Sequence, residues 1–348
     1  MAELKMLAID LGASSGRGII GKFDGEKLTL EENHRFASEP VTIAGSFNWD
    51  ILRIFHEIKQ AINKCALSDD KDIKSIGIDT WGVDYGLLDK HGKLLTNPVH
   101  YRDDRTIGAQ EEAFKIFSKK DIYDITGIQF MNFNTLFQLF VEMRDNPELL
   151  AAADKLLFIP DLLNYFLTGV KQTEYTIAST GQLLDAKTRD WSKTLFDKFG
   201  IPSRLFTDRK MPGSIVGPLL PEILEDVGDI KADVVNVAAH DTASAVMAVP
   251  ELGTPLYISS GTWSLLGVEQ NKAHTSKSAL DAGYSNEGSL NNTVRLQINI
   301  MGLWMIQQVR HELDDKYSFA ELVNMARENP VDYEINVNDQ RFLAPENM

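Results

Sequence analysis

Two short segments carry side chains that could transfer a phosphoryl group, and the first is His240-Asp241-Thr242. It follows an apolar run typical of a buried strand and precedes small residues typical of a helix, which run to about Val249. A carboxylate held at such a junction can accept a proton from a substrate hydroxyl while that oxygen attacks phosphorus. Asp or Thr before a helical run is also the usual N-cap, so capping is the alternative role for Asp241, and the two roles are compatible.

The second segment begins at Asp10 and continues through small residues to Arg17. Backbone N–H groups in a turn with little side-chain bulk can cradle a phosphate, and a guanidinium adds positive charge. The Asp10 carboxylate could hold Mg²⁺ directly or through water. The segment matches neither common glycine-rich nucleotide motif, so an ordinary hairpin turn is the alternative. The residues that could contact phosphate in this turn are Gly12, Ala13, Ser14, Ser15, Gly16 and Arg17.

A second small polar turn, Ser259-Ser260-Gly261-Thr262, supports the phosphate reading of the first. The stretch 255–267 has the same plan as 7–20, which is an apolar strand, a small polar turn and another apolar strand. Two such turns facing each other could grip a phosphate chain from both sides, and they favour nucleotide binding. They also suggest a duplicated domain whose halves face each other across a cleft.

Three further polar segments are candidates for sugar contacts, and each has a structural alternative. Trp81-Gly82 could offer a flat ring and a close backbone approach, or Trp81 could be buried beside a turn. Residues 131–135 could donate hydrogen bonds to hydroxyls, although Asn134 or Thr135 could instead cap a helix. The charged run 101–105 could line a binding loop or form local ion pairs.

The elements that must position these residues alternate between strands and helices. Strands are expected over 6–9, 19–23, 28–30, 73–79 and 83–88, with a helix after Asp50 and a helix-rich stretch over 106–167. The sequence therefore predicts an α/β fold. At 348 residues we expect two lobes, over 1–245 and 246–348. If the lobes are duplicates, the second lacks later strand and helix units, so we expect it to be incomplete at the C-terminus.

Composition excludes several classes of partner. The chain holds 35 Lys and Arg against 50 Asp and Glu, a net charge of −15 that disfavours nucleic acid and anionic membranes. Cys65 is the only cysteine, so no disulfide within the chain is available, and the N-terminal residues do not resemble a secretory signal. These features predict a cytoplasmic protein with a small neutral substrate. No pattern in the sequence indicates an oligomeric state.

The motifs together resemble those of the FGGY family of carbohydrate kinases, over nearly the whole chain. In family order they are Asp10–Arg17, Gly77–Asp84, Phe133–Thr135, His240–Val246, Ser259–Ser264 and Asn299–Trp304. The resemblance implies an actin-like (RNase H-like) two-lobed ATPase fold. It also implies transfer of the γ-phosphate of ATP, with Mg²⁺, to the 1-hydroxyl of L-rhamnulose in L-rhamnose catabolism.

The resemblance assigns roles residue by residue. Asp241 matches the proton acceptor of the family. The residues resembling sugar contacts are Gly82, His240, Thr242 and Asn299, and those resembling nucleotide contacts are Ala13 to Arg17, Thr262 and Gln307. Family members continue past the position of Met348 into a glycine-rich segment that contacts adenosine, so we expect a weakened grip on ATP. The alternatives are a kinase for another ketose or polyol, a sugar-binding chain without catalysis, and an actin-like filament protein.

Overall fold

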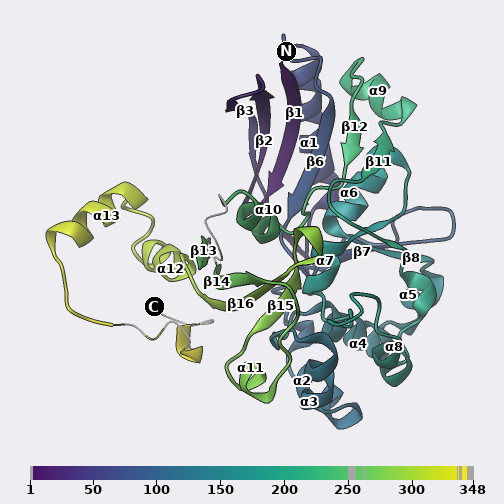
Figure 1. Cartoon of the computed structure of the whole chain (residues 1–348), viewed down its shortest axis with the longest axis vertical. Helices are drawn as coiled ribbons and strands as arrows, with labels where there is room; N and C mark the ends of the chain where they lie inside the picture. The colour runs from purple at the N-terminus through teal and green to yellow at the C-terminus, as the bar shows by residue number, and fades with distance from the viewer. Residues whose placement is uncertain (1–2, 250–255, 262, 335, 337–338, 343–348) are drawn as a thin grey trace.

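The computed structural model describes residues 3–249, 256–261, 263–334, 336 and 339–342, and it is built on a six-stranded sheet (Figure 1). The strand order is β11-β12-β6-β1-β2-β3, in which β1, β6 and β12 run parallel. The bounds are β1 Leu4–Leu11, β2 Ser15–Phe23, β3 Leu28–Ala37, β6 Ser75–Thr80, β11 Ile215–Pro218 and β12 Asp233–Val235. The expected hairpin around residues 12–16 is confirmed, since β1 and β2 pair antiparallel with Asp10 opposite Arg17.

Helices α1 (Ile51–Ala66), α6 (Ile159–Thr168) and α9 (Pro221–Val227) pack around this sheet. Helix α1 is amphipathic, because its buried residues Ile51, Ile54, Ile58 and Ile62 recur at helical spacing. Its N-cap is Asp50, whose carboxylate accepts the Arg53 N–H at 3.1 Å. These apolar side chains share one continuous core with the strands, which makes this part of the molecule a rigid support.

A second apolar core lies among the helices of the middle of the chain. Those helices are α2 Ala109–Ile116, α3 Lys119–Thr126, α4 Thr135–Asp145, α5 Pro147–Ala152, α7 Tyr175–Thr180 and α8 Lys193–Phe199. Short strands complete this region, namely β4 Val41–Ile43, β5 Ser46–Asn48, β7 Tyr85–Leu88, β8 Lys155–Phe158, β9 Thr173–Glu174 and β10 Arg209–Lys210. The expected helix-rich stretch is confirmed, with β8 interrupting it. Within the described ranges, no helix is both long enough and apolar enough to cross a membrane.

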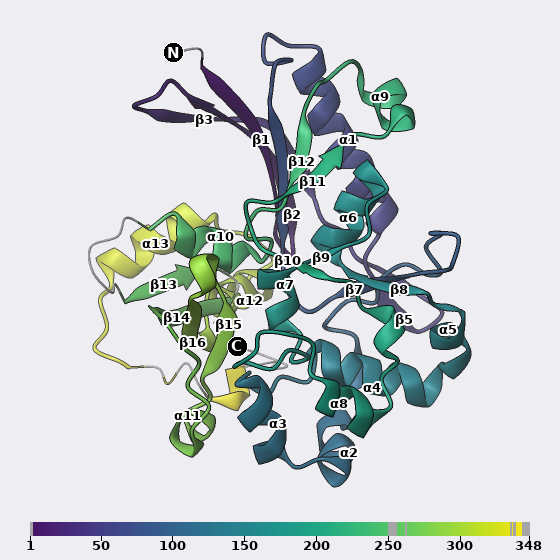
Figure 2. The same cartoon turned by 45° about the vertical axis from the view of Figure 1, so that its right-hand side comes forward.

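A separate four-stranded antiparallel sheet follows α10 (Asp241–Met247) in the chain. Its order is β13-β14-β16-β15, and its elements are β13 Tyr257–Ser260, β14 Trp263–Gln270, α11 Lys277–Asp281, β15 Ser285–Gly288, β16 Val294–Met301, α12 Trp304–Glu312 and α13 Phe319–Glu328. The pairing of β13 with β14 reproduces that of β1 with β2, as the repeat predicts. Figures 1 and 2 show the two sheets apart, with α10 between them.

The edge strand β15 of the second sheet contacts helix α7. The Gly288 N–H donates to Ser179 Oγ of α7 at 2.8 Å, and the Asn286 N–H donates to the Gly127 carbonyl at 2.9 Å. A Cβ at Gly288 would lie 2.5 Å from the ring of Tyr175, so only glycine allows this approach. We call this contact between β15 and α7 the seam, and polar groups make much of it.

Candidate active site

The carboxyl ends of the parallel strands β1 and β6 bring acidic side chains together with α10. Asp10 and Asp79 are register partners in these neighbouring strands. The Thr80 N–H donates to the Ala239 carbonyl at 2.9 Å, which places the start of α10 beside the same edge. Burial raises the pKa of Asp79 well above its ordinary value, and the charges of Asp10 and Asp241 add to that rise. Three carboxylates therefore share one site, where Asp79 favours its protonated form.

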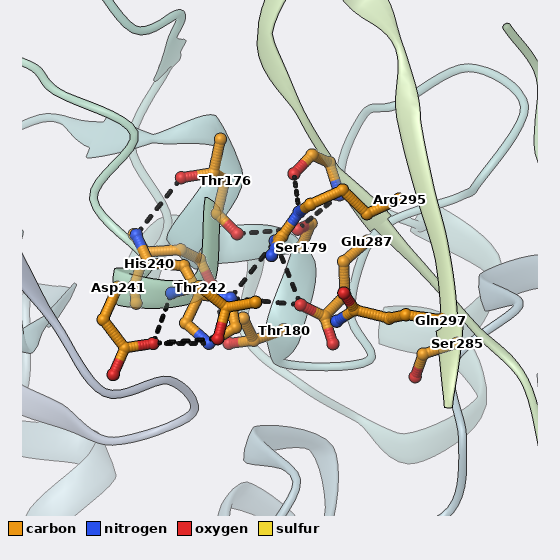
Figure 3. A network of polar contacts seen from close by, with 12 residues as sticks. Thr176, Ser179, Thr180, His240, Asp241, Thr242, Ser285, Glu287, Arg295 and Gln297 are labelled. Atoms are coloured by element: carbon orange, nitrogen blue, oxygen red, sulfur yellow. Dashed lines mark hydrogen bonds and ion pairs between the residues drawn. The ribbon is translucent and has the colours of Figure 1, made fainter. Parts of the chain in front are cut away.

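Asp241 is the first residue of α10, and its side chain keeps 37% of its surface exposed. His240, without a side-chain capping bond, occupies the N-cap position, so the capping alternative for Asp241 is wrong. The carboxylate instead accepts the N–H of Thr242 and, at 3.1 Å, its hydroxyl (Figure 3). Burial raises the pKa of Asp241, while the nearby His240 opposes that rise. Asp241 is thus a rigidly held carboxylate that is still accessible to a ligand.

The predicted phosphate turn follows β1 directly and so lies at this same edge of the sheet. The Gly12 N–H donates to the Ser15 carbonyl at 2.9 Å and closes the turn, at whose tip Ser14 is exposed. Gly16 packs beneath it, where a Cβ would lie 2.3 Å from the Phe36 ring. The Arg17 guanidinium donates to Asp10 Oδ2 at 2.7 Å. The turn is therefore a compact loop beside a guanidinium and a carboxylate, which suits a phosphate with its cation.

Gly82 lies beside a buried aromatic pocket that holds an acid the sequence reading did not single out. Trp81 is 6% exposed and stacks on Trp49 with ring centroids 3.8 Å apart, which confirms the buried alternative for Trp81. Asp84 accepts N–H bonds from Trp49 at 2.7 Å, Gln138 at 2.9 Å and Trp81 at 3.1 Å. Burial raises the pKa of Asp84 to about 6, and these neutral donors only partly oppose it. In the sequence, the position of Asp84 two residues after Trp81-Gly82 could have marked it as part of this pocket.

A cavity of about 780 Å³ opens between the helical region and the second sheet. Phe133 lies between Tyr101 and Trp263 in its lining, with ring centroids 5.4 Å and 6.1 Å away. Asn299 also lines it, and its N–H donates to Gln129 Oε1 at 3.2 Å. Aromatic faces and amides are the groups that recognise sugars.

The cavity and the acidic site share no lining residue. Gly82, His240, Asp241 and Thr242 are not among the residues lining the cavity. Burial raises the pKa of Tyr101, and the charge of Asp241 contributes to that rise, so this lining residue lies within electrostatic reach of the carboxylate. Of the predicted sugar contacts, Asn299 therefore lines the cavity, and the other three lie outside its lining.

Both alternatives for the charged run 101–105 occur in the structure, whereas the capping bond expected from the Asn134 side chain does not. Arg102 lines the cavity and lies over the Trp304 ring at 4.5 Å, whereas Arg105 pairs with Glu142 at 2.6 Å. Asn134 occupies the N-cap position of α4, but its side chain makes no capping bond and donates to Gln182 Oε1 at 2.9 Å.

Two nucleotide contacts were predicted after residue 246, and the structure describes one of them. Gln307 lies half-buried on α12, and its N–H donates to the Leu303 carbonyl at 3.0 Å. Thr262 lies outside the described residues. The neighbouring Gly261 carbonyl accepts the Leu303 N–H at 2.9 Å, so the start of α12 adjoins the second turn.

Comparison with known proteins agrees with this arrangement. Residues 5–248 match the model of the FGGY family of carbohydrate kinases, N-terminal domain. Rhamnulokinases of Oceanobacillus iheyensis and Bacillus subtilis are 46% and 43% identical to the chain over 98% of its length. The chain spans 72% and 70% of those two proteins.

Solved structures extend the comparison to the fold. A ligand-bound xylulose kinase of Lactobacillus acidophilus superposes with a TM-score of 0.79 at 20% identity, over 94% of this chain and 66% of that one. A Plasmodium falciparum glycerol kinase with ADP gives 0.75 at 20% identity, over 94% and 67%. The predicted actin-like α/β fold is confirmed. Because the family model covers more than half of the chain, the chain belongs to the FGGY family of carbohydrate kinases.

Proposed function

We propose that this chain transfers the γ-phosphoryl group of ATP to the 1-hydroxyl of L-rhamnulose, giving L-rhamnulose 1-phosphate and ADP. The observation that carries the proposal is the Asp241 carboxylate, held at the first residue of α10 and 37% exposed, beside the phosphate turn. Relatives at 42–46% identity that bear the name rhamnulokinase support the choice of sugar.

Asp241 is the proposed catalytic base. As the 1-hydroxyl oxygen attacks phosphorus, Asp241 accepts its proton, and the bond from phosphorus to the bridging oxygen of ADP breaks. The raised pKa of Asp241, caused by burial, makes its carboxylate a stronger base than one in water. Thr242 holds one carboxylate oxygen, which leaves the other for the substrate. Positioning of the two reactants supplies much of the rate.

The remaining predicted contacts divide between sugar and nucleotide. For the sugar we propose Gly82, His240, Thr242 and Asn299, with the aromatic cavity as its entrance. For ATP we propose Ala13, Ser14, Ser15, Gly16, Arg17, Thr262 and Gln307. The residues of both sets come from the two lobes, which we propose as 1–245 and 246–348. Binding between them would exclude water from the reacting groups.

The residues present fit a magnesium ion. Mg²⁺ is usually held by one or two carboxylates together with phosphate oxygens, rather than by a complete protein cage. Asp10 offers a partly exposed carboxylate beside the phosphate turn, and the described residues contain no group of three or more metal-binding side chains. Bound there with ATP, Mg²⁺ would neutralise charge on the phosphates.

Turnover of the chain as it stands tests the proposal. ATP-dependent product is measured with L-rhamnulose, L-fuculose, xylulose and glycerol in the presence of Mg²⁺. We expect L-rhamnulose to give the highest kcat/KM, and Asp241→Asn to lower kcat by about 10²- to 10⁴-fold, the usual contribution of a general base. Unchanged turnover in Asp241→Asn would remove the assigned role, and preference for another sugar would correct the substrate. Sugar binding by calorimetry without any product would leave a binding protein.

A further inference from the structure

The backbone and the ring of His240 are held by different parts of the molecule. The His240 N–H donates to Thr176 Oγ1 of α7 at 3.2 Å, and the Thr80 N–H of β6 donates to the neighbouring Ala239 carbonyl at 2.9 Å. These contacts fix where the side chain begins. They do not fix the direction of the ring, because the last torsion of a histidine side chain has only broad preferences.

Two side chains of the second sheet contact the ring, and the proposed reaction gives them no role. His240 Nδ1 lies 3.1 Å from Glu287 Oε2 of β15 and 3.1 Å from Arg295 Nη2 of β16 (Figure 3). Arg295 Nη2 also lies 3.1 Å from Glu287 Oε2, so the three atoms form a closed triangle. Both side chains are buried, and packing limits their own movement. The triangle therefore restricts rotation of the ring.

Strand β15 is anchored on the same short helix, α7, as the His240 backbone. Ser179 lies one turn after Thr176 on α7, and its Oγ accepts the Gly288 N–H of β15 at 2.8 Å. The Gly288 carbonyl accepts from Arg295 Nε at 3.1 Å. Helix α7 therefore sets the distance between the His240 backbone and the side chains that contact its ring.

The opposite edge of the ring faces the proposed base. His240 Nε2 lies 3.4 Å from Asp241 Oδ1, and the His240 side chain keeps 10% of its surface exposed. Because the imidazole is rigid, the contacts that hold Nδ1 also set the position of Nε2. A turn of the ring about the Cβ–Cγ bond would carry Nε2 away from the carboxylate that receives the proton of the sugar hydroxyl.

We propose that Glu287 and Arg295 are positioning residues for the sugar site, which act from the second sheet by fixing the direction of the His240 ring. The inference rests on the proposed function, in which His240 contacts the sugar. Residues that hold a binding side chain in one orientation raise affinity by removing the cost of ordering it. Docking of β15 on α7 is then a condition for tight sugar binding.

Steady-state kinetics of the full chain with L-rhamnulose and ATP test this role. A double variant, Glu287→Met with Arg295→Met, removes both contacts to Nδ1 and leaves neither residue buried without its partner. We expect KM for L-rhamnulose to rise about tenfold, the effect of losing one hydrogen bond, with KM for ATP unchanged. An unchanged KM for the sugar would overturn the proposal.

Two single variants calibrate this effect. Glu287→Gln keeps the length of the side chain and one oxygen, so it should raise KM for L-rhamnulose less than the double variant does. The matched control is Glu269→Gln on β14, whose carboxylate accepts from Ser289 and Thr293 and which should leave both KM values unchanged. A rise in the sugar KM of the control as large as that of the double variant would contradict the positioning role.

A double-mutant cycle separates positioning from general support of the fold. In a His240→Ala background the ring is absent, so the double variant should raise KM for L-rhamnulose no further. Equal effects of the double variant with and without the ring would mean that Glu287 and Arg295 act on the sugar site by another route, and would overturn the proposal.

The direction of the ring can be measured without turnover. Crystal structures of the parent and of the double variant compare the torsion about the His240 Cβ–Cγ bond, which we expect to change. An unchanged ring would overturn the proposal. If the parent phosphorylated no sugar, the proposed function would fail, and the two crystal structures would still decide whether Glu287 and Arg295 direct the ring.

Discussion

Two buried carboxylates in different regions have pKa values that are shifted in opposite directions. Asp84, in the aromatic pocket of the first region, is 1% exposed, and Glu287, at the seam, is 5% exposed. Burial raises the pKa of Asp84 to about 6, because its hydrogen-bond partners are neutral indole, amide and backbone groups. Glu287 is buried as well, but its interactions with His240 and with the Arg295 guanidinium outweigh the burial and lower its pKa to about 2.

The difference reflects how each region is assembled. The pocket around Asp84 lies within segments that share continuous apolar cores, so packing holds its residues and the carboxylate only orients them. The second sheet contributes a run of buried polar residues at the seam, and the described residues of α12 and α13 include no buried position. Ion pairing therefore holds the elements together at the seam, whereas apolar packing holds them together in the two cores.

The sharpest test of this difference removes the cation that holds Glu287. Arg295→Met keeps a long side chain but leaves the buried Glu287 carboxylate without the guanidinium that lies 3.1 Å away. We expect the free energy of unfolding, measured by urea denaturation at neutral pH, to fall by about 3–5 kcal/mol, the usual cost of breaking a buried ion pair.

A double variant supplies the control for this prediction. Replacing both Glu287 and Arg295 by Met removes the uncompensated charge. Exchanging a buried ion pair for apolar residues often leaves the stability of a protein unchanged. We expect most of the lost stability to return. A loss below about 1 kcal/mol in Arg295→Met would show that the seam does not depend on charge, and the contrast with Asp84 would fail.

Much of the fold was predictable from local patterns. The hairpin around residues 12–16, the amphipathic helix after Asp50 and the repeat of that hairpin at 255–267 each follow from short-range periodicity and turn composition. The apolar run before His240 was expected to form a buried strand, and in the structure this strand, β12, already ends at Val235. After Val235 the chain continues alongside the end of β6, where the Thr80 N–H donates to the Ala239 carbonyl, and reaches the site at His240. Tertiary packing sets this path, and no pattern in the sequence predicts it.

The candidate site was predictable where one segment carries the chemistry. Asp10, Arg17 and Asp241 were found from strand ends and small-residue turns, and the structure brings them together. Glu287 and Arg295 were missed, because each is an ordinary charged residue in a polar stretch. Their roles arise only from pairing across β15 and β16 and from docking onto α7, which places residues distant in sequence within 3.1 Å.

A second prediction tests the pocket of Asp84. Asp84→Asn keeps the shape but turns one oxygen into an amide that faces the Gln138 donor, so we expect a loss of about 2 kcal/mol in the free energy of unfolding. The size of the loss should depend on pH. The ordinary pKa of 3.8 rises to about 6 on folding, so the folded parent binds more protons between these values and loses stability as pH rises through this window.

The comparison with the variant isolates this effect. Asp84→Asn lacks the titration, so the stability difference between parent and variant should shrink as pH rises from about 4 to about 6. Urea denaturation at several pH values measures it. A difference that grows with pH over this window would mean that Asp84 is stabilised as an anion, as Glu287 is, and would erase the contrast between the two regions.

The smallest predicted effect isolates the neutral part of the seam. Ser179 Oγ accepts the Gly288 N–H at 2.8 Å and donates to the Thr176 carbonyl at 2.6 Å, so Ser179→Ala leaves a buried backbone donor unpaired without touching any charge. We expect the free energy of unfolding to fall by about 1 kcal/mol, against no measurable change for the exposed Ser278→Ala on α11. Because neutral hydrogen bonds contribute less than charged ones, a loss for Ser179→Ala as large as that for Arg295→Met would shift the role of holding the seam from the ion pair to the backbone contact.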